Sequence, residues 1–227
     1  MSPPIKYDYD DNYNPEKHDS TSIDAKVLAW INPGSRVLEI GCSSGYMGKV
    51  LWEKDCEVTG VELNPIAAVK REGFYQSMLI GDAEDPKTFD MINGQFDVIL
   101  CISVLEHLKK PLDILKILST LLKQNGYFLI TLPNIAHWSA RWALLRGRFD
   151  YEEYGILDNT HLRFFTFQSA QEMINDAGLS ILDSYFTPPD RPFFNRLPLV
   201  LKKCLLKIYY AYPNLFGYQF LFKAIRR

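Results

Sequence analysis

The sequence predicts an α/β fold: a Rossmann-like, doubly wound sheet of about seven strands, mostly parallel with an antiparallel last strand, with helices on both faces. From residue 36 to residue 133, short segments that are apolar throughout alternate with segments of helix length. Such strands are typical of parallel sheets that helices cover on both faces. The 227 residues, 47% hydrophobic and 23% charged, suffice for one domain with a full core.

The individual elements follow from apolar runs and from the residues that interrupt them. The expected strands are 36–41, 57–63, 76–81, 96–102, 127–132, 179–186 and 219–225. The expected helices are 22–31, 45–54, 65–72, 112–122, 166–177 and 196–210. Pro65 stands where a first helical residue is expected, while Thr166 is placed to cap a helix and Gly178 to end it.

One domain, 1–227, is expected, because the chain shows neither an internal repeat nor a low-complexity linker. It includes an N-terminal arm and helix at 1–31, an insertion at 134–165 and a basic amphipathic helical insertion at 190–215. The N-terminus lacks the apolar segment of a signal peptide, and no apolar run approaches the ~18–20 residues that span a bilayer. Four cysteines without CxxC spacing suit a reducing cytoplasm, and no metal site is expected.

A glycine-rich turn, residues 39–45 (Glu-Ile-Gly-Cys-Ser-Ser-Gly), joins the first expected strand to the helix after it. Its glycines let the backbone approach a ligand closely. The G-x-x-x-G spacing differs from the G-x-G-x-x-G dinucleotide fingerprint, and no Gly-Lys-Ser/Thr follows, so a phosphate-binding P-loop is excluded. The turn therefore predicts a nucleotide-like ligand of another kind.

Three carboxylates, Glu39, Glu62 and Asp82, stand at the ends of the first three expected strands. On this fold those strand ends line one crevice, where the acids would repel a pyrophosphate. They suit a ligand with an ammonium group, a sulfonium cation and a ribose diol. Glu62 is placed to bind the ribose hydroxyls and Asp82 to accept from an adenine amine. The alternative is that the three acids are solvated loop residues.

Four segments, VLEIGCSSG, VTGVEL, GDAED and FDVILCISVLEHL, stand in the order of the motifs of class I S-adenosylmethionine-dependent methyltransferases. The chain resembles that family over about residues 20–186. The resemblance implies that Gly41 and Gly45 surround the methionine part, that Asp82 and Ala83 contact the adenine, and that Ile102 and Ser103 flank the sulfonium. The expected cofactor-binding residues are Glu39, Gly41, Cys42, Gly45, Glu62, Leu63, Asp82, Ala83, Ile102 and Ser103. His107 is either catalytic or a structural cap.

The methyl acceptor is expected over residues 133–166. The segments PNIAHWSARWALLRGRF and DNTHLRFFT resemble a bacterial subgroup that includes methionine-biosynthesis protein W and methyltransferases of surface sugars and secondary metabolites. His161 is the candidate base, and Arg163 is a candidate for binding a carboxylate or phosphate. Alternatively, these two residues only tie the loop to the domain. The candidate substrate-binding residues are His137, Trp138 and Arg141.

The C-terminal part is basic, with eight bases and one acid in residues 190–227. The expected helix 196–210 places its bases in one arc, which is typical of contact with an anionic membrane or of a lid over an anionic substrate. Packing on its own domain and a homodimer contact are the alternatives. The net charge of −2 gives no reason to expect nucleic acid.

The expected function is methylation of oxygen on a small or carrier-linked metabolite such as a sugar, with S-adenosylmethionine as donor and S-adenosylhomocysteine as product. Nitrogen as the acceptor atom is one alternative, and a non-catalytic regulatory partner that binds the cofactor is another. Nucleic-acid methylation is disfavoured, because Cys101-Ile102-Ser103-Val104 stands where an Asn/Asp-Pro-Pro-Tyr/Phe motif would follow the fourth strand.

Overall fold

The computed structural model describes residues 21–70, 72–187 and 207–227, together with residues 15, 19, 198 and 201. The predicted N-terminal arm and most of the predicted helix 196–210 lie outside the described residues. The described end of that helix, residues 207–211, packs on the domain, since the ring of Tyr209 stacks on Phe186 and Phe216 with ring centroids 5.4 Å apart in each pair. None of the helices within the described ranges combines the length and the apolar character needed to cross a membrane.

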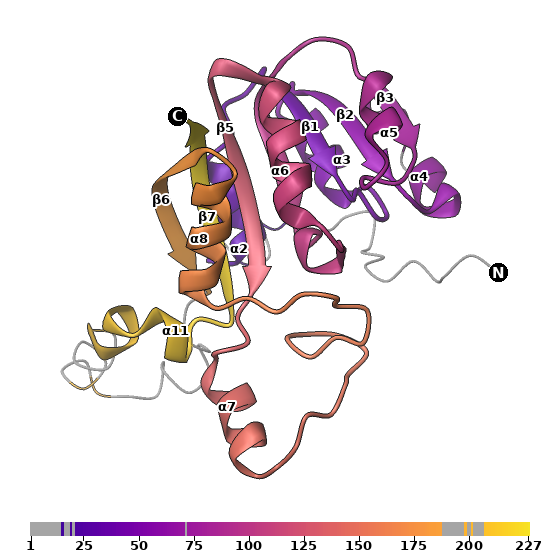
Figure 1. Ribbon diagram of the computed structural model, residues 1–227. Helices are drawn as coiled ribbons and strands as arrows, with labels where there is room; N and C mark the ends of the chain where they lie inside the picture. The colour runs from indigo at the N-terminus through magenta and orange to yellow at the C-terminus, as the bar shows by residue number, and fades with distance from the viewer. Residues whose placement is uncertain are drawn as a thin grey trace.

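A seven-stranded sheet forms the centre of the domain (Figure 1). Its strands are β1 (Arg36–Ile40), β2 (Glu57–Glu62), β3 (Ser77–Ile80), β4 (Phe96–Ile102), β5 (Leu122–Pro133), β6 (Leu179–Phe186) and β7 (Gln219–Arg226). Their order is β3-β2-β1-β4-β5-β7-β6, and β7 runs antiparallel to both of its neighbours, β5 and β6. The pairs among β1 to β5 are parallel. This arrangement confirms the predicted fold class, including the antiparallel last strand.

Helices cover both faces of the sheet. They are α2 (Ile23–Ala29), α3 (Tyr46–Trp52), α4 (Pro65–Lys70), α5 (Pro86–Asp90), α6 (Pro111–Thr120), α7 (Trp138–Leu145), α8 (Phe167–Asp176) and α11 (Pro213–Phe216), with the 3-10 turns η1 (Glu72–Phe74) and η2 (Leu105–His107). Thr166 caps α8 through a capping box with Ser169, as its position in the sequence predicted. The short helices α5, α7 and α11 were not predicted, because so few residues do not establish a period.

Two apolar clusters fill the space between the helices and the sheet. Strand β4 serves both, because its successive side chains point to opposite faces. Ile99 belongs to the cluster that packs α5, α6 and α8 on one face. Val98 and Leu100 belong to the cluster that packs α2 and α3 on the other face. The sheet is therefore covered on both faces, and a ligand has access at the carboxyl ends of the parallel strands β1 to β5.

Candidate functional site

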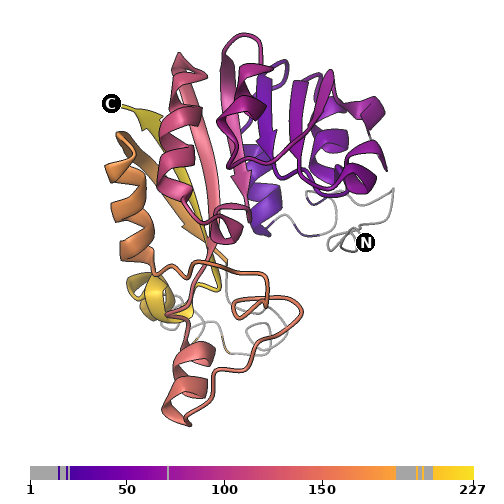
Figure 2. The same ribbon diagram turned by 45° about the vertical axis from the view of Figure 1, so that its right-hand side comes forward.

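A cavity of about 880 Å³ lies at the carboxyl ends of β1 to β4. Figure 2 shows the segment between α7 and α8 folded back beneath this edge of the sheet. Its lining includes the predicted residues Glu39, Gly41, Cys42, Glu62, Leu63, Asp82, Ala83, Ile102, Ser103 and His161. Most of the residues predicted for the cofactor thus share one cavity with the candidate base.

The turn after β1 depends on backbone angles that favour glycine. Gly41 has φ 76° and Gly45 has φ 75°, both in the left-handed region, and Gly45 is the N-cap of α3 rather than part of the cavity lining. A Cβ atom on Gly41 would lie 2.8 Å from Cγ2 of Val104. Both the angle and the space therefore require glycine at position 41.

Glu62 ties this turn to the end of β2. One carboxylate oxygen accepts a hydrogen bond from the backbone N–H of Ser43, and the other accepts one from the backbone N–H of Asn64, each at 2.8 Å. Asp82, which follows β3, accepts from the backbone N–H of Glu84 at 2.8 Å. Both carboxylates line the cavity, as expected for groups that bind a ribose and an adenine.

Glu39 is a buried carboxyl on the same side of the cavity. Only 4% of its surface is exposed, and the Tyr75 hydroxyl donates a hydrogen bond to it at 2.8 Å. Burial raises the pKa of Glu39 to about 8, and the nearby charge of Glu62 contributes to the increase. A cationic ligand beside Glu39 would favour the charged carboxylate and so lower this pKa.

Glu39→Gln should remove a pH dependence of folding stability. The folded-state pKa of about 8 lies above the ordinary carboxyl value of 4.5, so the stability that the neutral carboxyl gives is fully present below pH 4.5 and is lost as pH rises through about 8. The wild type should therefore lose stability relative to Glu39→Gln between pH 5 and pH 8. Urea denaturation at both pH values measures the difference. Glu172→Gln, at an exposed carboxyl on α8, is the control, and parallel wild-type and Glu39→Gln curves would contradict the expectation.

A hydrogen-bonded polar group lies in and behind the cavity wall, at the ends of β4 and β5, where Ser103 and Gln219 line the cavity and Thr131 is buried. The backbone N–H of Ser103 donates to Oγ1 of Thr131 at 2.8 Å. The amide of Gln219 donates to Oγ of Ser103 at 2.8 Å and to Oγ1 of Thr131 at 3.2 Å. Gln219 was not predicted as a site residue, although a polar residue at the start of an otherwise apolar strand is a signal.

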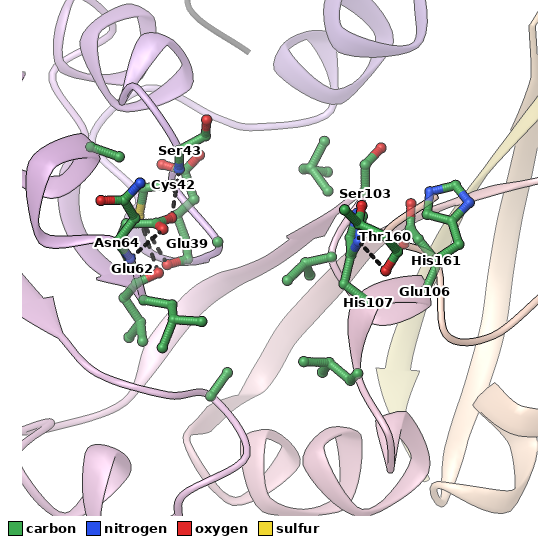
Figure 3. Close-up of a pocket in the computed structure, with 18 of the residues that line it drawn as sticks. Glu39, Cys42, Ser43, Glu62, Asn64, Ser103, Glu106, His107, Thr160 and His161 are labelled. Carbon is green, nitrogen blue, oxygen red and sulfur yellow. Dashed lines mark hydrogen bonds between the residues drawn. The ribbon is translucent and has the colours of Figure 1, made fainter. Parts of the chain in front are cut away.

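The third part of the lining is a cluster of Glu106, His107 and His161 (Figure 3). Figure 3 shows it across the cavity from Glu39, Cys42 and Glu62. The imidazole rings of His107 and His161 have centroids 4.9 Å apart. Glu106 is 1% exposed, and burial raises its pKa to about 8. Its backbone carbonyl accepts from the N–H groups of Leu162 and Arg163, which fixes the loop that carries His161.

Four predicted acceptor-side residues lie elsewhere. The guanidinium of Arg163 donates to the carbonyl of Lys109, with a shortest distance of 2.6 Å, and does not line the cavity. Trp138 and Arg141 line a separate hollow of about 420 Å³ beside α11. His137 caps α7, and its ring lies 5.4 Å from that of Tyr218, which does line the cavity. The structure therefore brings only His161 of this group to the predicted cofactor residues.

The sheet order, the glycine turn and the acidic strand ends together define a class I, S-adenosylmethionine-binding domain. The residues fit that cofactor, because the cavity presents the carboxylates of Glu39, Glu62 and Asp82 and requires glycine at position 41, while Lys109 is the one lysine or arginine in its described lining. The methyltransferase domain family matches residues 18–184. The chain belongs to this family, and S-adenosylmethionine is its cofactor.

Known proteins resemble the chain in sequence and in structure. The ubiquinone biosynthesis O-methyltransferase of Xanthomonas campestris pv. campestris is 33% identical over 105 residues, which is 44% of each chain. The likeness thus spans less than half of that relative. An S-adenosylmethionine-dependent methyltransferase from Archaeoglobus fulgidus has a TM-score of 0.66 at 19% identity, over 92% of this chain and 96% of that one. Magnesium protoporphyrin IX methyltransferase from Synechocystis PCC 6803, solved with bound S-adenosylhomocysteine, has a TM-score of 0.63 at 15% identity, over 98% and 91%.

Proposed function

We propose that this protein methylates a hydroxyl oxygen of a small or carrier-linked metabolite, such as a sugar. One observation carries the proposal: the cavity has two chemically different ends. Glu39, Cys42 and Glu62 lie at one end, and Glu106, His107 and His161 lie at the other (Figure 3). A nucleophilic oxygen held at the second end would face the methyl donor at the first. Positioning of this kind can supply a large part of the catalysis of a displacement.

The second end also suits an alcohol, because an alcohol must lose a proton as the new bond forms. Bound S-adenosylmethionine supplies the methyl group. Nδ1 of His161 lies 3.2 Å from the carbonyl oxygen of Ile156, which can only accept, so Nδ1 carries the hydrogen and Nε2 the lone pair. His161 acts on the hydroxyl through this lone pair. Nε2 can accept the hydroxyl proton directly, or it can bind a metal ion that lowers the pKa of the hydroxyl.

The names of relatives support oxygen as the acceptor atom, and the cysteines support the compartment in which we propose that the protein works. Two relatives that the chain matches, from Xanthomonas campestris pv. campestris and Marinobacter nauticus, are named as O-methyltransferases, which favours oxygen over nitrogen as the acceptor atom. Cys42, Cys56 and Cys101 are free thiols, as suits a reducing compartment such as the cytoplasm.

A panel of acceptors tests the proposal. The protein would be incubated with S-adenosylmethionine carrying an isotope-labelled methyl group and with sugars, nucleotide-linked sugars, phenols and amines. Mass spectrometry would then locate the labelled methyl group in each product. Labelled methyl ethers from a hydroxyl acceptor are expected. Labelled amines alone would move the reaction to nitrogen, and cofactor binding without transfer to any acceptor would favour a regulatory partner.

A further inference from the structure

We propose that Glu106, His107 and His161 bind a divalent transition-metal ion at the acceptor end of the cavity. The inference deepens the proposed function, on which its catalytic part rests, and it departs from the sequence-based expectation of no metal site. Glu106 and His107 belong to the turn η2 after β4, whereas His161 comes from the loop before α8. Two separate segments of the chain thus converge on one point of the cavity wall (Figure 3).

The first argument is distance. One ligand atom from each of the three residues lies within 4.8 Å of the other two. Around an ion with metal–ligand distances of about 2.0–2.2 Å, neighbouring ligand atoms lie roughly 3 to 3.5 Å apart. Small rotations of the side chains close that difference. The backbone of the loop is already fixed to η2, because the carbonyl of Glu106 accepts from two N–H groups of the loop.

The second argument is the orientation of the imidazoles. Nδ1 of His107 lies 3.2 Å from the carbonyl oxygen of Thr160, and Nδ1 of His161 lies 3.2 Å from the carbonyl oxygen of Ile156. Each Nδ1 therefore carries a hydrogen, and each Nε2 presents its lone pair. Metal-binding histidines commonly donate their second ring N–H to a backbone carbonyl in this way, which fixes tautomer and ring orientation.

The third argument is the unsatisfied carboxyl of Glu106. Its Oε2 is buried and has no hydrogen-bond partner within the part of the chain that the structure describes. Leaving a buried polar atom unpaired costs roughly 1–3 kcal/mol. Among the described residues, this Oε2 is the only buried side-chain nitrogen or oxygen without a partner, so its place in the cavity wall indicates a ligand. A cation between Glu106 and the two imidazoles would compensate that cost.

The ligand set selects the class of ion. Two neutral imidazoles and one carboxylate suit Zn²⁺, Fe²⁺, Mn²⁺ or Co²⁺, whereas Mg²⁺ and Ca²⁺ favour sites made of oxygen alone. Three protein ligands leave coordination positions for other molecules, and the cluster lines the cavity. An acceptor hydroxyl is the group that these positions would take.

The ion would explain how an alcohol becomes nucleophilic near neutral pH. A hydroxyl bound to it has a lowered pKa and gives its proton to water. The oxygen then forms its bond to the methyl carbon while the bond from that carbon to the sulfonium sulfur breaks, which leaves a neutral thioether. In this reaction His161 is a metal ligand, and no side chain needs to accept the proton.

Metal titration tests the site without methyl transfer. The full chain, without a histidine tag, would be treated with chelator, dialysed, and titrated with Co²⁺ by visible absorption and with Zn²⁺ by calorimetry. We expect one ion per chain, and we expect bound Co²⁺ to show visible d–d absorption bands shifted from those of the hydrated ion by its nitrogen ligands. Glu106→Gln and His161→Ala should each weaken Zn²⁺ binding by at least about 10-fold. The control Asn159→Ala changes an exposed residue of the same loop and should bind as the wild type does.

Glu106→Gln keeps the size of the side chain, and its binding of S-adenosylhomocysteine reports that the variant is folded. Absence of saturable binding by the wild type, or equal binding by the wild type and both variants, would overturn the metal site. Methylation that persists after exhaustive chelation would overturn the metal's part in catalysis and leave the proposed function standing. One-to-one binding that depends on Glu106 and His161, with no acceptor methylated, would instead remove the proposed function and keep the site.

Discussion

Gly41→Ala should weaken the binding of S-adenosylmethionine by at least about 100-fold, while the domain remains folded. Alanine pays about 1–2 kcal/mol for the left-handed backbone that Gly41 adopts at φ 76°. Its Cβ would also lie 2.8 Å from Cγ2 of Val104, so the turn or η2 must move. The expected loss combines this strain with the displacement of the backbone that faces the ligand. A 100-fold weaker affinity corresponds to about 2.8 kcal/mol, because each factor of ten corresponds to about 1.4 kcal/mol.

Calorimetric titration of S-adenosylmethionine and S-adenosylhomocysteine measures the effect, and circular dichroism reports the fold. Gly73→Ala is the matched control, because a Cβ there meets nothing within 4 Å. The double variant Gly41→Ala, Val104→Ala separates the two causes: it relieves the contact and leaves the strained angle. Binding by Gly41→Ala at the wild-type affinity would show that the cofactor does not depend on this turn.

His161→Ala should lower kcat by about 10²- to 10⁴-fold on a hydroxyl acceptor, with unchanged affinity for S-adenosylmethionine. The reason is position: His161 is the one predicted acceptor-side residue that lines the cavity, and it stands across from Glu39 and Glu62. Steady-state kinetics with saturating cofactor measures kcat, and calorimetry measures cofactor affinity. Asn159→Ala, at the exposed residue two positions earlier, is the control for damage to the loop.

A wild-type kcat for His161→Ala would remove this residue from the chemistry. It would then support the alternative that His161 only ties the loop to the domain. A parallel loss of cofactor affinity would point to the same structural role, because a group that acts on the acceptor alone leaves the cofactor site intact.

The fold was predictable because its signals are local and repeated. Strands 96–102 and 179–186 were predicted with the bounds that β4 and β6 show. The first is a largely apolar run, and the second lies between Gly178 and Pro188, which both interrupt regular structure. Strand β5 begins earlier than predicted, at Leu122, because Leu122 pairs with Phe96 ahead of a register shift. That pairing is a property of the neighbouring strand and leaves no mark in residues 122–126 themselves.

The two ends of the site differed in how well the sequence predicted them. The cofactor residues stand at strand ends, so the topology places them together once the strands are identified. The acceptor end depends on how the segment between α7 and α8 folds back, and that segment has no period to interpret. Glu106 belonged to a quoted motif, but its backbone carbonyl is hydrogen-bonded by residues about 55 positions away, Leu162 and Arg163, which no local pattern predicts.

The position of β7 between β5 and β6 affects the order in which the parts of the site can fold. Gln219, the first residue of β7, completes the hydrogen bonds around Ser103 and Thr131, yet it is made after every other strand of the sheet. Until β7 arrives, β5 and β6 have no partner on their facing edges, and such edges invite pairing with other chains. During synthesis, the turn after β1 and the ends of β2 and β3 can therefore form early, whereas the hydrogen bonds around Ser103 form only with the last strand.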